Sequence, residues 1–157
     1  MKITTLSAAD YERILAELPN YWGDERTRHL HHPLFVHEFK STAYAIKIGD
    51  LVAAYLLGFV ARENRYGYLH LVAVRGSHRQ RGLASALYTH FFQYCRERDV
   101  RLVKAITSPQ NTHSILFHKH MGFRLFGETI EHGVPVIKNY SGHHEDRVVM
   151  FRRLTDE

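Results

Sequence analysis

The stretch HLVAVRGSHRQRGLA, residues 70–84, decides how this chain folds. It continues a segment, residues 66–74, in which side chains alternate with a period of two, so that Leu69, Leu71 and Ala73 share one face of a strand. A short basic segment, residues 75–81, follows, and apolar residues then recur at helical spacing. The sequence therefore predicts a strand, a tight basic turn and a helix that carries Gly82 just inside its N-terminus.

This predicted helix start is suited to an anion. The first turn of a helix has unpaired N–H groups and a partial positive charge, and a glycine lets a phosphate approach the backbone. Arg75, Arg79 and Arg81 add positive charge around it. The alternative is an ordinary basic surface turn. The segment lacks the Gly-Lys-Ser/Thr of a Walker loop and the Gly-x-Gly-x-x-Gly of a dinucleotide site.

Composition narrows the class of protein. The 157 residues suit one domain, residues 1–157, and 45% hydrophobic and 24% charged residues are typical of a soluble globular protein. The one cysteine, Cys95, lies on an apolar helix stripe and is expected to be an inert core residue. No apolar run reaches the roughly 20 residues that span a membrane, and no signal-peptide core begins the chain. A cytoplasmic protein is expected.

The formal net charge of +5 predicts a polyanionic partner. Nucleic-acid binding usually requires basic residues clustered along one element, whereas here the densest cluster is the turn before the helix. A local phosphate site explains this distribution better than nucleic acid or a membrane surface does, so neither of these is expected as a partner.

The other helices and strands are predicted from the spacing of apolar residues and from the turn residues, such as glycine and proline, between them. The hairpin over residues 41–60 turns at Gly49 and Asp50 and is antiparallel, whereas the strand–helix–strand unit after residue 66 must be parallel. Further strands are expected over residues 2–6, 101–107, 123–129 and 146–153, and helices over about 9–18, 33–40, 80–98 and 111–121. Pro19 is expected to stop the first helix, and residues 130–145 to form a polar loop.

A second motif occupies residues 111–123, NTHSILFHKHMGF. Asn111 can cap a helix on which Ser114 and His118 share its side, and Gly122 suits the helix end.

Both motifs resemble those of the GCN5-related N-acetyltransferase (GNAT) superfamily. Arg79-x-x-Gly82-x-Ala84 is similar to the family's pyrophosphate-binding signature, and the second block matches at Asn111, Ser114, Gly122 and Phe123. His118 departs from it, because the family commonly has Tyr there. The order of elements agrees along essentially the whole chain. The resemblance implies a single-domain α/β fold (α+β in some schemes) with a mixed sheet of about six to seven strands and about four helices.

In this family acyl-CoA enters where the fourth and fifth strands splay apart. Pantetheine pairs with the fourth strand, and the pyrophosphate sits on amides at the helix start. The resemblance therefore implies acetyl-CoA as co-substrate, no metal, and cofactor contacts from Val72, Ala73, Val74, Arg79, Gln80, Arg81, Gly82, Leu83, Ala84, Asn111 and His118.

Transfer to an amine needs a base and a proton for the departing thiolate. His70 is the candidate base, with a core histidine bonded to nearby backbone as an equally weighted alternative. His118 is the candidate acid by its position, with a surface histidine as the alternative. The histidines at 29, 31, 32 and 37 form no metal-binding pattern and are expected on the surface or in the acceptor loop.

The resemblance predicts an N-acetyltransferase acting on an amine, with a small-molecule amine favoured over a protein and a homodimer possible. The alternative is a non-catalytic acyl-CoA sensor with the same fold, which the change at His118 keeps open. Candidate acceptor contacts are Tyr21, Trp22, Arg26 and Tyr140, although such loops are equally often plain connections.

Overall fold

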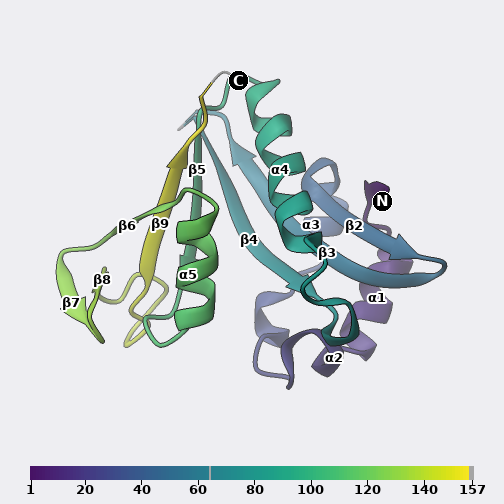
Figure 1. Cartoon of the computed structure of the whole chain (residues 1–157), viewed down its shortest axis with the longest axis horizontal. Helices are drawn as coiled ribbons and strands as arrows, with labels where there is room; N and C mark the ends of the chain where they lie inside the picture. The colour runs from purple at the N-terminus through teal and green to yellow at the C-terminus, as the bar shows by residue number, and fades with distance from the viewer. Residues whose placement is uncertain (64, 156–157) are drawn as a thin grey trace. The chain divides into compact units, whose positions relative to one another are not determined.

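The computed structural model describes residues 1–63 and 65–155 (Figure 1). Its contacts divide the chain into two compact units: residues 1–60 with 69–94, and residues 61–68 with 95–157. Strand β4 (Tyr66–Val74) and helix α4 (Leu83–Arg96) contribute residues to both. That residues 1–157 form a single domain stays a prediction, and each unit is described by itself.

The first unit is built on an antiparallel meander. Its strands lie in the order β1 (Ile3–Thr5), β2 (Ala43–Ile48), β3 (Leu51–Ala61) and β4. β2 pairs antiparallel with both β1 and β3. The tight turn between β2 and β3 places Gly49 at φ +60°, a conformation that favours glycine. The predicted hairpin is confirmed.

Helices cover both faces of this meander. His90 of α4 packs edge-on against Tyr44 of β2, with ring centroids 4.6 Å apart. The neighbouring Ala43 and Ala45 belong to a buried cluster with α1 (Ala8–Ala16) and α3 (Leu34–His37). Because side chains alternate across a strand, α4 lies on one face, in front in Figure 1, and α1 and α3 on the other.

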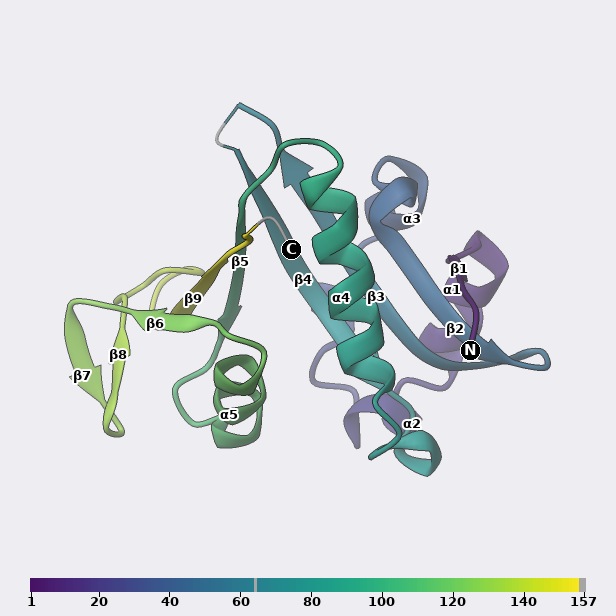
Figure 2. The same ribbon diagram turned by 45° about the horizontal axis from the view of Figure 1, so that its top comes forward.

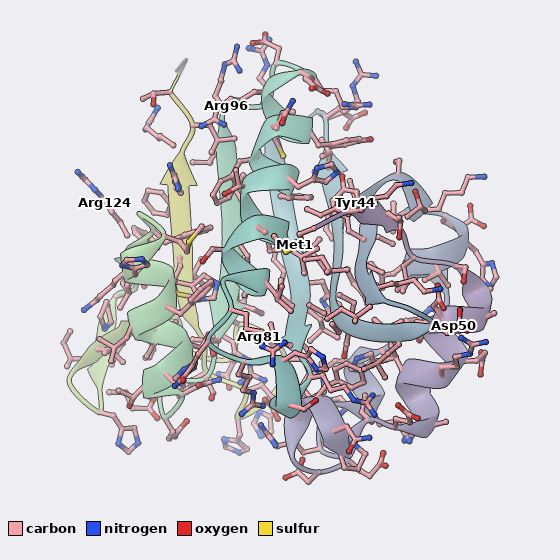
Figure 3. The ribbon with its side chains drawn as sticks, turned by 45° about the vertical axis from the view of Figure 1, so that its right-hand side comes forward. Met1, Tyr44, Asp50, Arg81, Arg96 and Arg124 are labelled. Carbon is pink, nitrogen blue, oxygen red and sulfur yellow. The ribbon has the colours of Figure 1, made fainter. Side chains whose placement is uncertain are left out.

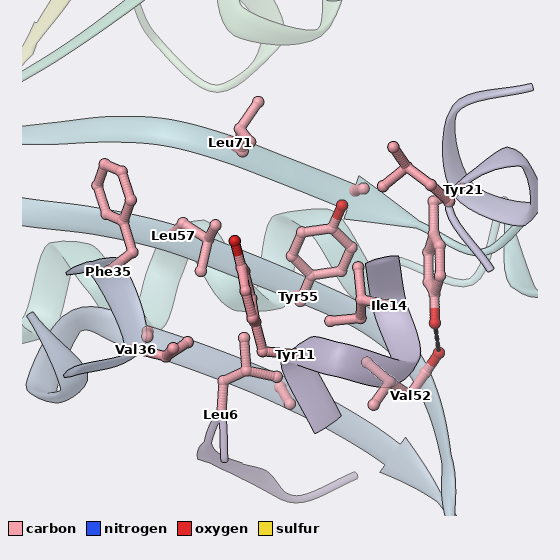
Figure 4. Packing of buried hydrophobic residues seen from close by; sticks show 14 residues of the cluster. Leu6, Tyr11, Ile14, Tyr21, Phe35, Val36, Val52, Tyr55, Leu57 and Leu71 are labelled. Atoms are coloured by element: carbon pink, nitrogen blue, oxygen red, sulfur yellow. Dashed lines mark hydrogen bonds between the residues drawn. The ribbon is translucent and has the colours of Figure 1, made fainter. Parts of the chain in front are cut away.

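The core of the first unit is the cluster between α1, α3 and the strands (Figure 4). Ile14, Tyr55 and Leu57 are fully buried in it. Tyr21 is also buried, and its hydroxyl donates a hydrogen bond to the Val52 carbonyl at 2.8 Å, the dashed line in Figure 4. Ser7 caps α1 by accepting a bond from the Asp10 N–H at 3.0 Å, as predicted.

The second unit contains the other strands. β9 (Val148–Arg153) lies between β5 (Leu102–Thr107) and β6 (Arg124–Phe126) and is antiparallel to both. The first residues of β4 neighbour β5, where Lys104 lies 4.7 Å above the Tyr66 ring. Because α4 carries the chain across from β4 to β5, these two strands are parallel, so the sheet is mixed as predicted (Figure 2). Helix α5 (Thr112–His120) completes this unit with the hairpin described next.

One local prediction was wrong and another was incomplete. The polar loop over residues 130–145 contains most of a hairpin, β7 (Thr129–Glu131) and β8 (Val134–Val136), whose three-residue strands are too short to show a period. Pro19 does not only stop α1, because it also begins α2 (Pro19–Trp22). Proline is tolerated in a first helical turn, where its missing N–H has no partner to lose.

Cys95 is fully buried in α4, and this burial raises the pKa of its thiol to about 12. Its predicted core location is confirmed. In the part of the chain that the structure describes, no helix has both the length and the apolar character needed to cross a membrane.

Replacing Ile14 by Ala should lower the free energy of unfolding by about 2–5 kcal/mol, because the side chain is completely buried and leaves a cavity. Ile48→Ala is the matched control. Ile48 is 50% exposed, so its loss should change the same quantity by less than about 0.5 kcal/mol. Urea unfolding of both variants measures the difference, and equal losses would contradict this description of the core.

Candidate functional site

The turn between β4 and α4 lies in the first unit. A short 3₁₀ turn (Gly76–His78) follows β4, and the Arg75 N–H bonds to the Ala53 carbonyl at 2.8 Å. Gly82 has φ +72°, and its carbonyl accepts the bond from the Ala86 N–H at 3.0 Å. Gly82 therefore lies just before the helix, not just inside it as predicted, because helical residues cannot adopt positive φ. The helix start still presents N–H groups that have no acceptor within the helix.

The arginines of this turn differ in what they contact. Arg75 forms an ion pair with Glu17 at 2.6 Å, and the Arg79 guanidinium donates to the Tyr21 carbonyl at 2.9 Å. Arg81 is exposed in the turn below α4 (Figure 3). The three arginines therefore have different surroundings, and their role around an anion stays a prediction. Arg75 is neutralised by Glu17, Arg79 fastens the turn to α2, and Arg81 lies open to solvent.

The end of β4 carries the residues predicted to face pantetheine. Ala73 is buried, whereas Val72 and Val74 are half-buried, which agrees with the predicted alternation. Leu83 begins the helix and is buried, and Gln80 in the turn has φ +60°. Their contacts with a cofactor stay a prediction.

His70 is held from two sides within the first unit. Its Nε2 lies 2.7 Å from the Leu30 carbonyl oxygen, and its ring stacks on Phe35 with centroids 4.5 Å apart and planes 9° from parallel. A carbonyl only accepts, so Nε2 carries the hydrogen. Burial lowers the pKa of His70, although the bond to Leu30 acts in the opposite direction. The backbone bond is the one that the core-histidine alternative expected. The same bond places the lone pair of the neutral imidazole on Nδ1.

The second motif forms a connected series in the second unit. The Asn111 side chain accepts the Ser114 N–H at 3.1 Å and caps α5, as predicted. The Ser114 carbonyl accepts from Nδ1 of His118 at 2.7 Å. His118 is 6% exposed, packs edge-on against Phe123, and has its pKa lowered by burial despite that backbone bond. The three predicted residues therefore share one side of the helix, and His118 is not a surface histidine.

The predicted acceptor contacts are of different kinds. Tyr21 is in the core, and Trp22 donates from its ring N–H to the Tyr55 hydroxyl at 2.7 Å. Arg26 is exposed and bonds to the Trp22 carbonyl and to Asp24, at 2.7 and 2.8 Å. Tyr140, in the second unit, is 40% exposed. Arg26 and Tyr140 are therefore the more accessible of the four.

One histidine of the acceptor segment is more buried than the sequence indicated. His31 was expected on the surface or in the acceptor loop; it lies in that loop segment, but its side chain is buried, with its ring nitrogens 2.8 Å from the Thr27 carbonyl and from the Tyr55 hydroxyl. Its partner Tyr55 lies 24 residues away inside an apolar strand, so no local pattern could indicate the pair. Among the described residues, no three His, Cys, Asp or Glu side chains gather in a group that could hold a metal ion.

The chain is similar to known proteins in sequence and in fold. The family model "Acetyltransferase (GNAT) family" matches residues 8–123, well over half of the chain. A search of curated protein sequences gives no match.

Solved structures resemble the whole chain. Ard1 from Thermoplasma volcanium is 20% identical with a TM-score of 0.76, covering 99% of this chain and 98% of its own. The ribosomal-protein-S18-alanine N-acetyltransferase from Escherichia coli is 17% identical with a TM-score of 0.69, covering 99% and 95%. An aminoglycoside 6'-N-acetyltransferase complexed with coenzyme A is 14% identical with a TM-score of 0.71, covering 100% and 99%. At these identities the likeness concerns the fold, and the predicted fold class is confirmed.

Two buried histidines, His31 and His118, and the half-buried His70 should make stability depend on pH. Burial lowers the pKa values of His31, His70 and His118 in the folded state. The unfolded chain protonates histidine near its ordinary pKa of about 6.5. Stability is therefore fully present above that pKa and is lost as pH falls below it, by up to about 1.4 kcal/mol per pH unit for each histidine.

Urea unfolding at pH 7.5, 6.5 and 5.5 checks this expectation, with Trp22 as the fluorescent probe. His118→Phe should reduce the pH slope, whereas the exposed His120, replaced by Phe, should leave it as in the unmodified protein. An unfolding free energy that stays constant from pH 7.5 to 5.5 would show that these rings protonate as easily in the fold as outside it.

Proposed function

Because the chain belongs to the acetyltransferase (GNAT) family, we propose that it transfers an acetyl group from acetyl-CoA to an amine by direct attack on the thioester. The observation that carries the proposal is the helix start after β4. There, Gly82 at φ +72° directly precedes a 14-residue helix, and the exposed Arg81 adjoins it. Such a start favours a pyrophosphate on its backbone amides.

The cofactor would be held mainly by backbone groups. The pyrophosphate would lie on the N–H groups of residues 79–84, and the pantetheine arm would pair with Val72, Ala73 and Val74. Asn111 and His118 would approach the pantetheine arm and the thioester. One fold relative, the aminoglycoside acetyltransferase, was solved with coenzyme A, which supports this choice of co-substrate.

His70 is the proposed base. An alkyl ammonium has a pKa near that of lysine, about 10.4, so it must lose a proton before it can attack. A neutral imidazole with its lone pair on Nδ1 can take that proton, directly or through water. The amine nitrogen then bonds to the thioester carbonyl carbon and releases its second proton to solvent water, the C–S bond breaks, and the thiolate leaves with the bonding pair. Protonation of the thiolate completes the amide and free CoA.

His118 is the proposed donor of that last proton. Its Nδ1 hydrogen is committed to the Ser114 carbonyl, so the neutral ring carries its lone pair on Nε2. His118 must therefore take up a proton before it gives one to the thiolate. Its burial makes the protonated ring a stronger acid than an exposed histidine would be.

The favoured acceptor is a small-molecule amine without several further positive charges. A polycation would need carboxylates that have no partner. In the first unit Asp10 contacts Lys47 at 3.1 Å, Glu17 contacts Arg75, and Asp24 and Glu25 contact arginines at 2.8 and 2.7 Å. Asp24 and Glu25 are the acidic residues of the segment 21–32 proposed to face the acceptor, so their pairing with arginines leaves little negative charge there.

The decisive assay measures CoA release from acetyl-CoA across a library of amines. Release that depends on one class of amine supports the proposal and identifies the acceptor. If acetyl-CoA binds tightly and no amine yields thiol or acetylated product, the non-catalytic sensor is the better description.

Gly82→Glu should abolish the rise in melting temperature that CoA produces. CoA at a hundred times its Kd is worth roughly 2.7 kcal/mol of stability, and a carboxylate beside those amides repels the phosphates. Gly49→Glu is the matched control, since Gly49 also has positive φ with open space where a Cβ would stand. Without CoA, the melting temperature of Gly49→Glu should fall about as much as that of Gly82→Glu. CoA should still raise the melting temperature of Gly49→Glu as it does in the unmodified protein. A full shift in Gly82→Glu would place the cofactor elsewhere.

His118→Phe should lower kcat by about 10²–10⁴-fold while changing acetyl-CoA affinity little, because a proton donor acts mainly in the transition state. His118→Tyr, which restores the commoner family residue, should recover much of the loss. His120→Phe on the same helix is the control and should keep the rate. Steady-state kinetics with an acceptor of low pKa makes the comparison. Turnover of His118→Phe at the unmodified rate would make His118 a packing residue.

A further inference from the structure

A buried chain of hydrogen bonds joins strand β3 to the segment that precedes α3. The Tyr55 side chain has no exposed surface. Its hydroxyl accepts from the Trp22 ring N–H at 2.7 Å and lies 2.8 Å from Nε2 of His31. Nδ1 of His31 lies 2.8 Å from the Thr27 carbonyl. All of these residues belong to the first unit.

The chemistry of the partners fixes the direction of each bond. The Thr27 carbonyl only accepts, so the hydrogen of the neutral His31 ring is on Nδ1. Nε2 of His31 then carries the lone pair, and the Tyr55 hydroxyl donates to it. This hydroxyl therefore uses both its acceptor and its donor capacity, with Trp22 on one side and His31 on the other.

This chain fixes the turn that holds His70. The turn over residues 28–30 is closed by bonds from the Leu30 N–H to the Thr27 carbonyl, at 2.9 Å, and from the His31 N–H to the Arg28 carbonyl, at 3.0 Å. Leu30, the residue directly before His31, supplies the carbonyl that accepts from Nε2 of His70. Phe35 stacks on the same ring and sets its plane.

We propose that Tyr55 and His31 are positioning residues for His70: they hold the turn so that the Leu30 carbonyl keeps the hydrogen of His70 on Nε2, and the lone pair on Nδ1. The use of Nδ1 as the proton acceptor rests on the proposed function. The fixed tautomer does not, and it can be measured without any substrate. Tyr55 and His31 need not touch either substrate, because they act through the Leu30 carbonyl.

Long-range ¹H–¹⁵N correlations of the imidazole rings report the tautomer of each histidine in ¹⁵N-labelled protein. In the unmodified protein at pH 7.5, His70 should show the Nε2–H form and His31 the Nδ1–H form. In Tyr55→Phe, which keeps the ring but removes both bonds to its hydroxyl, His70 should lose this preference and show averaged shifts at its two nitrogens.

Tyr11→Phe is the matched control. Tyr11 is 1% exposed in the same buried cluster, and its hydroxyl has no hydrogen-bond partner among the described residues. Removing that hydroxyl should leave the His70 tautomer and the activity as they are. His31→Phe is a second route, should Tyr55→Phe fail to fold, because it fills the ring volume and removes the same anchor. Melting temperatures establish which variants are folded.

Kinetics provide the separate test of catalysis. With an accepted amine of low pKa, Tyr55→Phe should lower kcat by roughly 10- to 100-fold, as expected for a misplaced group, and leave the KM for acetyl-CoA unchanged. The acidic limb of the kcat/KM profile against pH should also move, in Tyr55→Phe, toward the pH at which an ordinary histidine titrates. An Nδ1–H form of His70 in the unmodified protein, or an unchanged tautomer in a folded Tyr55→Phe or His31→Phe, would overturn the positioning role. Absence of turnover with every amine would refute the proposed function and leave the tautomer result standing.

Discussion

The hydroxyl of Tyr55 imposes the constraint on which much of the first unit depends. A buried hydroxyl without partners costs about 1–3 kcal/mol, and Tyr55 has no contact with water. Its two partners are Trp22, the last residue of α2, and His31, which lies between α2 and α3 in a segment of short turns with little regular structure. The two hydrogen bonds to the Tyr55 hydroxyl therefore fix where that segment lies against β3. His70 contacts the segment through its bond to the Leu30 carbonyl.

Much of the fold could be predicted from the sequence, because its signals are local. The alternation over residues 66–74, the Ser7 and Asn111 caps and the glycine turn at Gly49 each depend on neighbours a few residues away. The features that were missed depend on distant partners or on too few residues. His31 is buried by a residue 24 positions away, and each strand of the β7–β8 hairpin has three residues.

In the candidate site, too, features that depend on local spacing could be predicted, and features that depend on distant partners could not. The spacing of Asn111, Ser114 and His118 indicated one helix face correctly, because helical geometry alone determines it. What each ring nitrogen contacts was beyond the sequence, since backbone carbonyls have no side-chain signature. The Leu30 and Ser114 carbonyls set opposite tautomers on the two histidines, with the hydrogen on Nε2 of His70 and on Nδ1 of His118. The ion pair of Arg75 with Glu17 was also beyond the sequence, because the two residues lie 58 positions apart.

The burial of Cys95 has a practical consequence. It is the chain's one cysteine, and a thiol with a pKa of about 12 is almost wholly unionised at neutral pH. Because the thiolate is the species that attacks disulfides and electrophiles, Cys95 of the folded protein should not react with chromogenic disulfide reagents. Colour formed with such a reagent would then come from small thiols in solution, and the folded protein should form no disulfide-linked dimer in oxidising buffers.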